Sequence, residues 1–358
     1  MILICLWTGA AQAEGWLDSS EFGRLKAFAD GAGFDAEGFL EELLTGETPF
    51  GVETLKGALD LLTSEVKASL TALLRELMLP VAACAALRLG MGRDTAAGEL
   101  MSLACALCCA GALSRAFLSA RAEAEGLISA LVDASKALTP VMVSACAVSG
   151  APVTAGLLTP LAAEGAAIAQ FALRDAGLGL CSAAGAVAVA GSLSGRFPLD
   201  RLFDLLKTLV KWLLGMSAVL FGALALVQGG MGAARDSAAA RAARSALESL
   251  VPVLGGGLSD SAGALAVSAG TLRRAVGFTG VALSLSVCAG PMLRLTGHML
   301  SARLAAAVLE PIIEGGAARL VERFGELFEL LLAVCLTCEI MTALLAGGCA
   351  ACLGGALG

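Results

Sequence analysis

Three pairs of cysteines have the two-residue spacing that zinc and redox sites use. They are Cys105 and Cys108, Cys335 and Cys338, and Cys349 and Cys352. Each pair lies in an apolar segment, where a neutral cysteine packs as a small apolar side chain and a thiolate would be costly to desolvate. No cysteine occurs in the polar stretch 14–67, where a disulfide-bridged domain would need them. We therefore interpret the cysteines as packing residues and predict no metal site.

Other catalytic signatures are absent from the sequence. His298 is the single histidine, which excludes multi-histidine centres, and we expect it at the membrane interface at the end of a span. The sequence has no phosphate-binding loop, no Gly-x-Ser-x-Gly elbow and no His-Glu-x-x-His pair. With 58% apolar and 15% charged residues, a water-soluble enzyme is excluded. We predict a protein that is not an enzyme and binds no cofactor.

Two carboxylates, Glu164 and Glu339, fall inside apolar segments. A charge at the centre of a bilayer costs about 3 kcal/mol on insertion scales, so each must face protein or water. They could form a path for cations or protons, or each could pair with an arginine such as Arg75 or Arg294 on a neighbouring helix. The sequence favours pairing.

A further candidate is a break between helices at 251–260. Proline ends the preceding helix, three glycines release the backbone, and a serine or aspartate can cap the helix that starts near residue 261. The break comprises Pro252, Gly255, Gly256, Gly257, Ser259 and Asp260. It is either a non-helical stretch packed among spans, with the next helix pointing its positive end at a cavity, or an ordinary surface loop.

The elements that must position these residues are apolar segments near the 20 or so residues that a spanning helix needs. They are residues 70–88, 98–118, 138–172, 176–195, 212–230, 275–297 and 327–350. Segment 138–172 can hold one span or two, and the abundant alanine and glycine suit closely packed membrane helices. We predict an all-α, polytopic membrane domain over 68–358 with seven or eight spans.

Two amphipathic helices are predicted between spans, at 196–211 and 234–250, where they would rest in the membrane interface. The first is expected to lie flat before the next span turns inward. Its polar residues are Arg196, Asp200, Asp204, Lys207 and Lys211.

The N-terminal part has a different character. Residues 1–13 are a short apolar run ending in Ala-Gln-Ala, which is typical of a secretory signal peptide. Residues 14–66 carry 12 acidic and 3 basic residues, a balance better suited to the translocated side of the membrane. Short helices are expected here, one ending at Gly31 and the next capped by Asp35. We predict that 14–67 is a small extracytoplasmic region, packed on the membrane surface or on a partner.

Three segments carry a resemblance to a known family. They are SLSGRFPLDRLFDLLKTLVKWLLG at 192–215, LVQGGMGAARDSAAARAARSALESLVPVLGGGLSD at 226–260, and EPIIEGGAARLVERFGELFELLLAV at 310–334. The chain resembles stage III sporulation protein AE of endospore-forming bacteria from the acidic region to the last span. It departs from that family in its short, uncharged leader and its alanine- and cysteine-rich spans.

The resemblance implies a multi-pass protein of the mother-cell membrane, facing the engulfed forespore. It implies a subunit of a channel or feeding conduit related to secretion systems and needed for forespore development. Its expected partners are other stage III sporulation A-type membrane subunits, a separate cytoplasmic ATPase and the lipid bilayer, with no nucleic acid. The alternative is a self-sufficient secondary transporter for an ion or small solute, favoured by the intramembrane acids and by a Leu-Thr-Pro motif that recurs at Leu138 and Leu158.

The predicted orientation can be tested with a reporter that is active only in the cytoplasm, fused after Thr45. We expect no signal, because the apolar leader and the acidic charge both favour translocation of this region. A strong cytoplasmic signal would overturn both the signal peptide and the orientation that depends on it.

Overall fold

The computed structural model describes residues 20–31, 33–39, 63–64, 67–68, 71, 96–148, 156–157, 159–193, 199–226, 255–309 and 316–351. Its helices are α2 (Ser20–Gly31), α5 (Ala96–Val148), α6 (Thr159–Ala172), the π-helical turn η2 (Leu173–Gly177), α7 (Leu178–Leu193), α8 (Asp200–Leu226), α10 (Gly255–Leu309) and α11 (Gly316–Ala351). No strand occurs within the described ranges. The prediction of an all-helical protein is confirmed.

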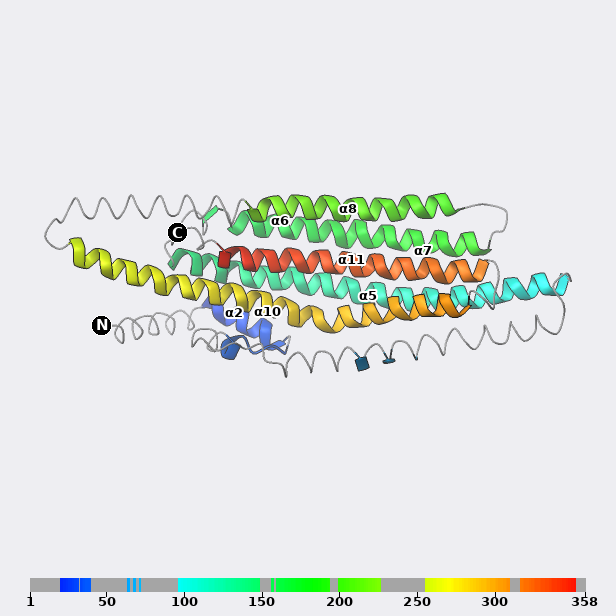
Figure 1. Ribbon diagram of the computed structural model, residues 1–358, viewed down its shortest axis with the longest axis horizontal. Helices are drawn as coiled ribbons and strands as arrows, with labels where there is room; N and C mark the ends of the chain where they lie inside the picture. Colours follow the sequence, from blue (N-terminus) through cyan, green and yellow to red (C-terminus); the bar gives the residue numbers. More distant parts are fainter. Residues whose placement is uncertain are drawn as a thin grey trace.

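The long helices form an elongated up-and-down bundle (Figure 1). Helices α5, α8 and α11 run in one direction, while α10 and the continuous helix formed by α6, η2 and α7 run in the other. Helix α11 lies at the centre and contacts α5, α6, α7, α8 and α10. Packing in the bundle is therefore organised around the last helix of the described chain.

Five helical segments are long and apolar enough to cross a membrane. They are Ala106–Ala147, Thr159–Ser192, Asp200–Ala223, Ala275–Ala307 and Arg319–Gly347. The predicted count of seven or eight spans is not reached within the described residues, and the predicted span 70–88 lies outside them except for Thr71. The predicted boundaries between spans also change. Residues 98–118 and the first part of 138–172 were predicted as separate segments, but both belong to the single helix α5.

The separation expected between residues 172 and 176 is wrong, because the chain passes through that point as helix. The turn η2 inserts wider i→i+5 hydrogen bonding without ending the helix, so α6 and α7 share one axis. A turn was also expected between the interfacial helix at 196–211 and the span at 212–230. This prediction is wrong as well, because the chain continues as helix through that point. Helix α8 is one helix of 27 residues that includes both segments.

The break predicted at 251–260 is also corrected in part. Helix α10 begins at Gly255, so Gly255, Gly256, Gly257, Ser259 and Asp260 all have helical backbone. Glycine costs about 1 kcal/mol relative to alanine in a helix but does not forbid one. Neither Ser259 nor Asp260 caps the start of this helix. Pro252 and the predicted helix 234–250 lie outside the described residues.

The lengths of α5 and α10 exceed the thickness of a bilayer. They contain 53 and 55 residues, which at 1.5 Å per residue gives about 80 Å, against about 30 Å for the hydrocarbon core. Charges divide the bundle lengthwise, since Glu339 is the single charged residue in 212–226, 275–293 and 330–351. We call 212–226, 275–293 and 330–351, together with the facing segments 126–148 and 159–173, the apolar half. The charged half comprises 103–125, 174–193, 200–211, 294–307 and 319–329.

The described part of the acidic region packs on the bundle. The cap by Asp35 is confirmed, because the Gly38 amide donates to its carboxylate at 3.0 Å. Leu25, Ala29 and Ala36 are buried in the common apolar core, and α2 contacts α5 beside the apolar half (Figure 1). Helix α2 thus packs on α5, and contact of region 14–67 with the membrane surface or with a partner stays a prediction. Lys26 pairs with Glu37, which raises the pKa of this exposed lysine.

Three helices of the apolar half meet at Gly280 of α10. A methyl group added there would lie 2.9 Å from Cβ of Ala346 and 3.1 Å from Cδ2 of Leu138. Both distances are shorter than ordinary contacts between carbon atoms, and Ala346 has no flexible side chain that could move away. The absence of a side chain at Gly280 therefore sets how closely α10, α11 and α5 approach.

Replacing Gly280 with valine should destabilise the bundle by about 1–3 kcal/mol, because overpacking forces the three helices apart. Thermal unfolding of the full chain in detergent, followed by circular dichroism, measures this loss. The matched control is Gly222→Val in α8, where an added methyl group meets nothing within 4 Å. Equal melting temperatures for the two variants would contradict close packing at Gly280.

Candidate functional site

Glu339 lies in α11 within the apolar half, and its side chain is almost completely buried, with 5% of the residue exposed. The Ser284 hydroxyl of α10 lies 2.9 Å from its Oε1, and the Cys288 thiol donates to its Oε2 at 2.8 Å. None of the ion pairs within the described residues includes Glu339. The arginine expected as its partner, Arg294, pairs instead with Glu123 at 3.2 Å, and Arg75 lies outside the described residues.

A second buried polar contact joins α6 to the same stretch of α11. The Gln170 side chain is fully buried, and its Nε2 donates to Oγ1 of Thr342 at 2.9 Å and to the carbonyl of Cys338 at 3.3 Å. Its Oε1 is buried and has no hydrogen-bond partner among the described residues. Gln170 of α6 and Ser284 and Cys288 of α10 thus place neutral polar groups against α11 in the apolar half.

The charged half has a different chemistry, because ion pairs join its helices. They are Arg174 with Glu125, Arg294 with Glu123, Lys207 with Glu326, Arg303 with Glu329, and Arg323 with Asp200. These five pairs connect α5 to η2 and α10, and α11 to α8 and α10. Arg174 lies in the π-helical turn, so η2 is fixed against α5 by this pair.

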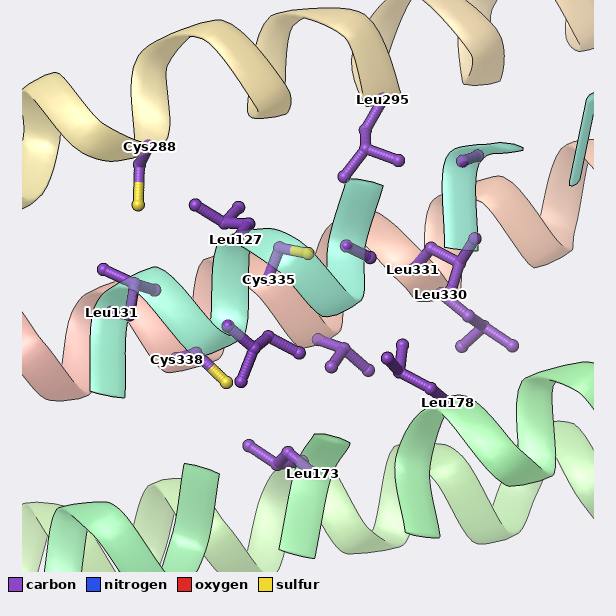
Figure 2. Close-up of a cluster of buried hydrophobic side chains, with 14 of the residues drawn as sticks. Leu127, Leu131, Leu173, Leu178, Cys288, Leu295, Leu330, Leu331, Cys335 and Cys338 are labelled. Carbon is purple, nitrogen blue, oxygen red and sulfur yellow. The ribbon is translucent and has the colours of Figure 1, made fainter. Parts of the chain in front are cut away.

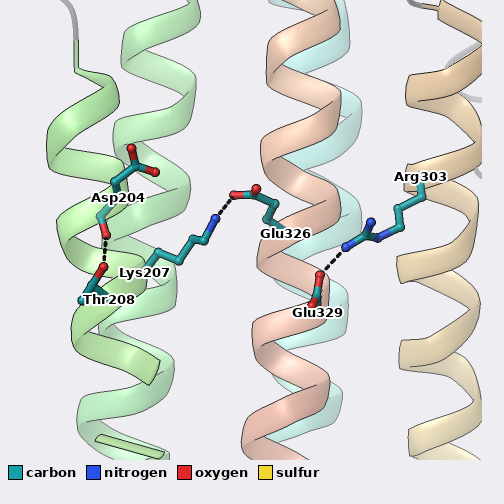
Figure 3. A network of polar contacts seen from close by, with 6 residues as sticks. All are labelled: Asp204, Lys207, Thr208, Arg303, Glu326 and Glu329. Carbon is teal, nitrogen blue, oxygen red and sulfur yellow. Dashed lines mark hydrogen bonds and ion pairs between the residues drawn. The ribbon is translucent and has the colours of Figure 1, made fainter. Parts of the chain in front are cut away.

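The first part of α8 provides two of these ion pairs, through Asp200 and Lys207. Lys207 donates to Glu326 at 2.8 Å, while Glu329, one turn further along α11, accepts from Arg303 on the opposite side (Figure 3). Asp204 accepts a hydrogen bond from Thr208 through its carbonyl. The charged face that predicted an interfacial helix therefore binds α11 in part, whereas Lys211 is exposed and Arg196 lies outside the described residues.

His298 and most of the described cysteines pack among apolar side chains, whereas Cys108 is exposed. His298 lies within α10 and not at the end of a helix, since the helix continues to Leu309, and its ring stacks on Phe328 with 5.7 Å between centroids. Cys335 and Cys338 are buried among leucines between the helices (Figure 2). Over the described residues, no group of three or more histidine, cysteine or acidic side chains could hold a metal ion.

Glu164 differs from Glu339 although the two were predicted together. It lies in the second turn of α6, near the end of the bundle, and its side chain is exposed. Because an exposed carboxylate near a helix end can reach polar surroundings, Glu164 does not share the constraint on Glu339. The structure thus brings Glu339 together with α10 and leaves Glu164 apart.

Sequence reasoning missed the neutral partners Gln170, Ser284, Cys288 and Thr342. One available signal was a glutamine inside an apolar run, because a buried amide in a membrane helix needs a partner on another helix. The acidic residues of α11 gave a second signal, since Glu322, Glu326 and Glu329 recur at three- and four-residue spacing in its first part. The cations that pair with Glu329 and Glu326 are 26 and 119 residues away in sequence and could not be assigned from spacing.

These features define a class of protein. Five helices could cross a membrane, their buried polar groups are mostly neutral, and the ion pairs between helices are collected in one half of the bundle. The molecule is a helical membrane protein.

Comparison with known proteins identifies the family. A model of the family described as stage III sporulation protein AE matches residues 34–351. The chain is also similar to stage III sporulation protein AE of Bacillus subtilis (strain 168), with 24% identity over 176 residues. That match covers 49% of this chain and 44% of the length of the relative. No solved structure matches the chain. The chain belongs to the stage III sporulation protein AE family, which gives it a role in sporulation.

The pairing of α8 with α11 can be tested by exchanging charges. Lys207→Glu should lower the melting temperature in detergent, because it places two carboxylates face to face where a pair worth about 1 kcal/mol stood. The double variant Lys207→Glu/Glu326→Lys should restore most of the loss, and Lys211→Glu, at an exposed position of the same helix, should have little effect. A double variant as unstable as the single variant would contradict this contact.

Proposed function

We propose that this protein is a non-enzymatic membrane subunit of the complex that links mother cell and forespore during sporulation. The observation that supports the proposal most directly is the family match over 34–351, which covers all five candidate spans. A subunit that works within an assembly needs no phosphate-binding loop of its own, because a separate cytoplasmic ATPase would supply the energy. Its other partners would be the remaining stage III sporulation A-type membrane subunits.

The distribution of charge supports a specific placement in the mother-cell membrane. We place the hydrocarbon core across the apolar half, where 275–293 and 330–351 each provide about 30 Å of helix at 1.5 Å per residue. Exposed apolar side chains on the outer helices then face lipid, among them Ile168, Trp212 and Val219. The charged half, with its five ion pairs, extends beyond the hydrocarbon core as a bundle.

This placement also supports opposite sides for the two polar parts of the chain. Helix α2 lies beside the apolar half, whereas the charged half continues from the other end of it. With the acidic region outside the cytoplasm, the charged half would face the cytoplasm. That end is the natural position for contact with a cytoplasmic ATPase.

Affinity purification of the tagged full chain from sporulating cells, in mild detergent, tests the proposal. We expect an ATPase and further sporulation membrane subunits to be recovered together, and none of them from growing cells that express the same tagged chain. Recovery of the chain alone, combined with solute uptake by liposomes that contain only the purified chain, would instead establish a self-sufficient transporter.

A further inference from the structure

The hydrogen-bond contacts around Glu339 accommodate a protonated carboxyl group as well as an ionised one. Oγ of Ser284 lies 2.9 Å from the carbonyl oxygen of Val281 and 2.9 Å from Oε1 of Glu339. A serine hydroxyl has one hydrogen, and a carbonyl oxygen can only accept. When Ser284 donates to Val281, the contact with Glu339 is a hydrogen bond only if Glu339 carries a proton and donates it to Oγ.

Among the side chains that the structure describes, no positive charge beside Glu339 favours the ionised form. On α10, the facing titratable group is Cys288, and on α11 they are Cys335 and Cys338, all free thiols. Within the described residues of the apolar half, the other charged groups are paired or exposed. On α5, Asp133 and Lys136 pair with each other at the surface, and Glu164 of α6 is exposed. Arg294 of α10 pairs with Glu123. Helix α8 has no charged residue from Trp212 to Leu226.

The depth of Glu339 strengthens this conclusion. Glu339 follows Glu329 by ten residues and precedes Ala351 by twelve, so about 15 Å of apolar helix separates it from the charged half and slightly more from the described end of α11. An unpaired carboxylate at such a position is costly, whereas a neutral carboxylic acid with two hydrogen-bonded neighbours is not.

We propose that Glu339 is a proton-binding site of the membrane bundle, protonated at neutral pH and able to release its proton reversibly at higher pH. In the protonated form, the Glu339 hydroxyl donates to Oγ of Ser284, Ser284 donates to the carbonyl of Val281, and the Cys288 thiol donates to Oε2. On release, the proton passes to a base in the aqueous phase and leaves a carboxylate. Ser284 then turns its hydrogen from Val281 to Oε1, so the carboxylate accepts two hydrogen bonds.

The rotation of one hydroxyl group therefore satisfies both protonation states without movement of the helices. That property distinguishes a reversible proton site from a carboxylic acid that is only buried. The site depends on the contact between α10 and α11 and not on any partner protein, so it can fail or hold independently of the proposed function.

Infrared spectroscopy of the purified full chain in lipid vesicles tests the proposal, because a protonated carboxylic acid has a carbonyl band distinct from that of a carboxylate. At pH 7 we expect a protonated-acid band that disappears in Glu339→Gln and remains in the matched control Glu164→Gln, whose carboxylate is exposed. On raising the pH, the wild-type band should be lost and should return when the pH is lowered again.

A second variant tests the hydrogen bond. Ser284→Ala removes the acceptor of the Glu339 proton and should shift the band to higher frequency, which does not require Glu339 itself to be changed. The proposal is overturned if wild type and Glu339→Gln give the same spectrum at pH 7, or if the band persists at every pH at which the helices remain folded. An unshifted band in Ser284→Ala would overturn the assignment of Ser284 as its partner.

Discussion

The central position of α11 is the constraint on which the rest of the bundle depends. This helix contacts all of the other long helices and is the most deeply buried of the candidate spans. Lipid cannot hydrogen-bond a side chain, and at the centre of a bundle few water molecules can either, so each polar group on α11 needs a partner from a neighbouring helix. Gln170 of α6 meets this need at Thr342, and Ser284 and Cys288 of α10 meet it at Glu339.

The five ion pairs of the charged half contribute to the arrangement of the helices more than to their stability. Most of their side chains are partly exposed, and such a pair contributes about 0–1 kcal/mol. Each pair nevertheless favours one lengthwise position of two helices, since a shift by one turn would separate its charges. Stability comes instead from close packing of small residues, as at Gly280, where the side chains of Ala346 and Leu138 fill the space that a Cβ atom would need.

The sequence predicted the helical membrane class, because composition and the length of apolar runs depend on solvent and not on packing. It predicted helix boundaries less well. The sequence divided 138–172 from 176–195, yet Arg174 and Asp175 between them lie in a π-helical turn, where Arg174 pairs with Glu125 of α5. Glycines at 255–257 suggested a break, yet helix formation continues through them. The sequence singled out Glu339, but its partners lie 51 and 55 residues away and depend on how α10 packs.

Glu329 and Glu339 show how position along one helix decides the kind of partner. Both are glutamates of α11, and a cation from α10 is paired with the first, whereas a hydroxyl and a thiol from α10 contact the second. At Glu329 an arginine keeps contact with water, so pairing removes little hydration from either ion. At Glu339 an arginine would bring a second charge into the apolar half, and the cost of desolvating two ions can exceed their attraction. A neutral hydroxyl and a thiol avoid this cost, and because they supply no charge, the carboxyl group keeps a proton that can be exchanged.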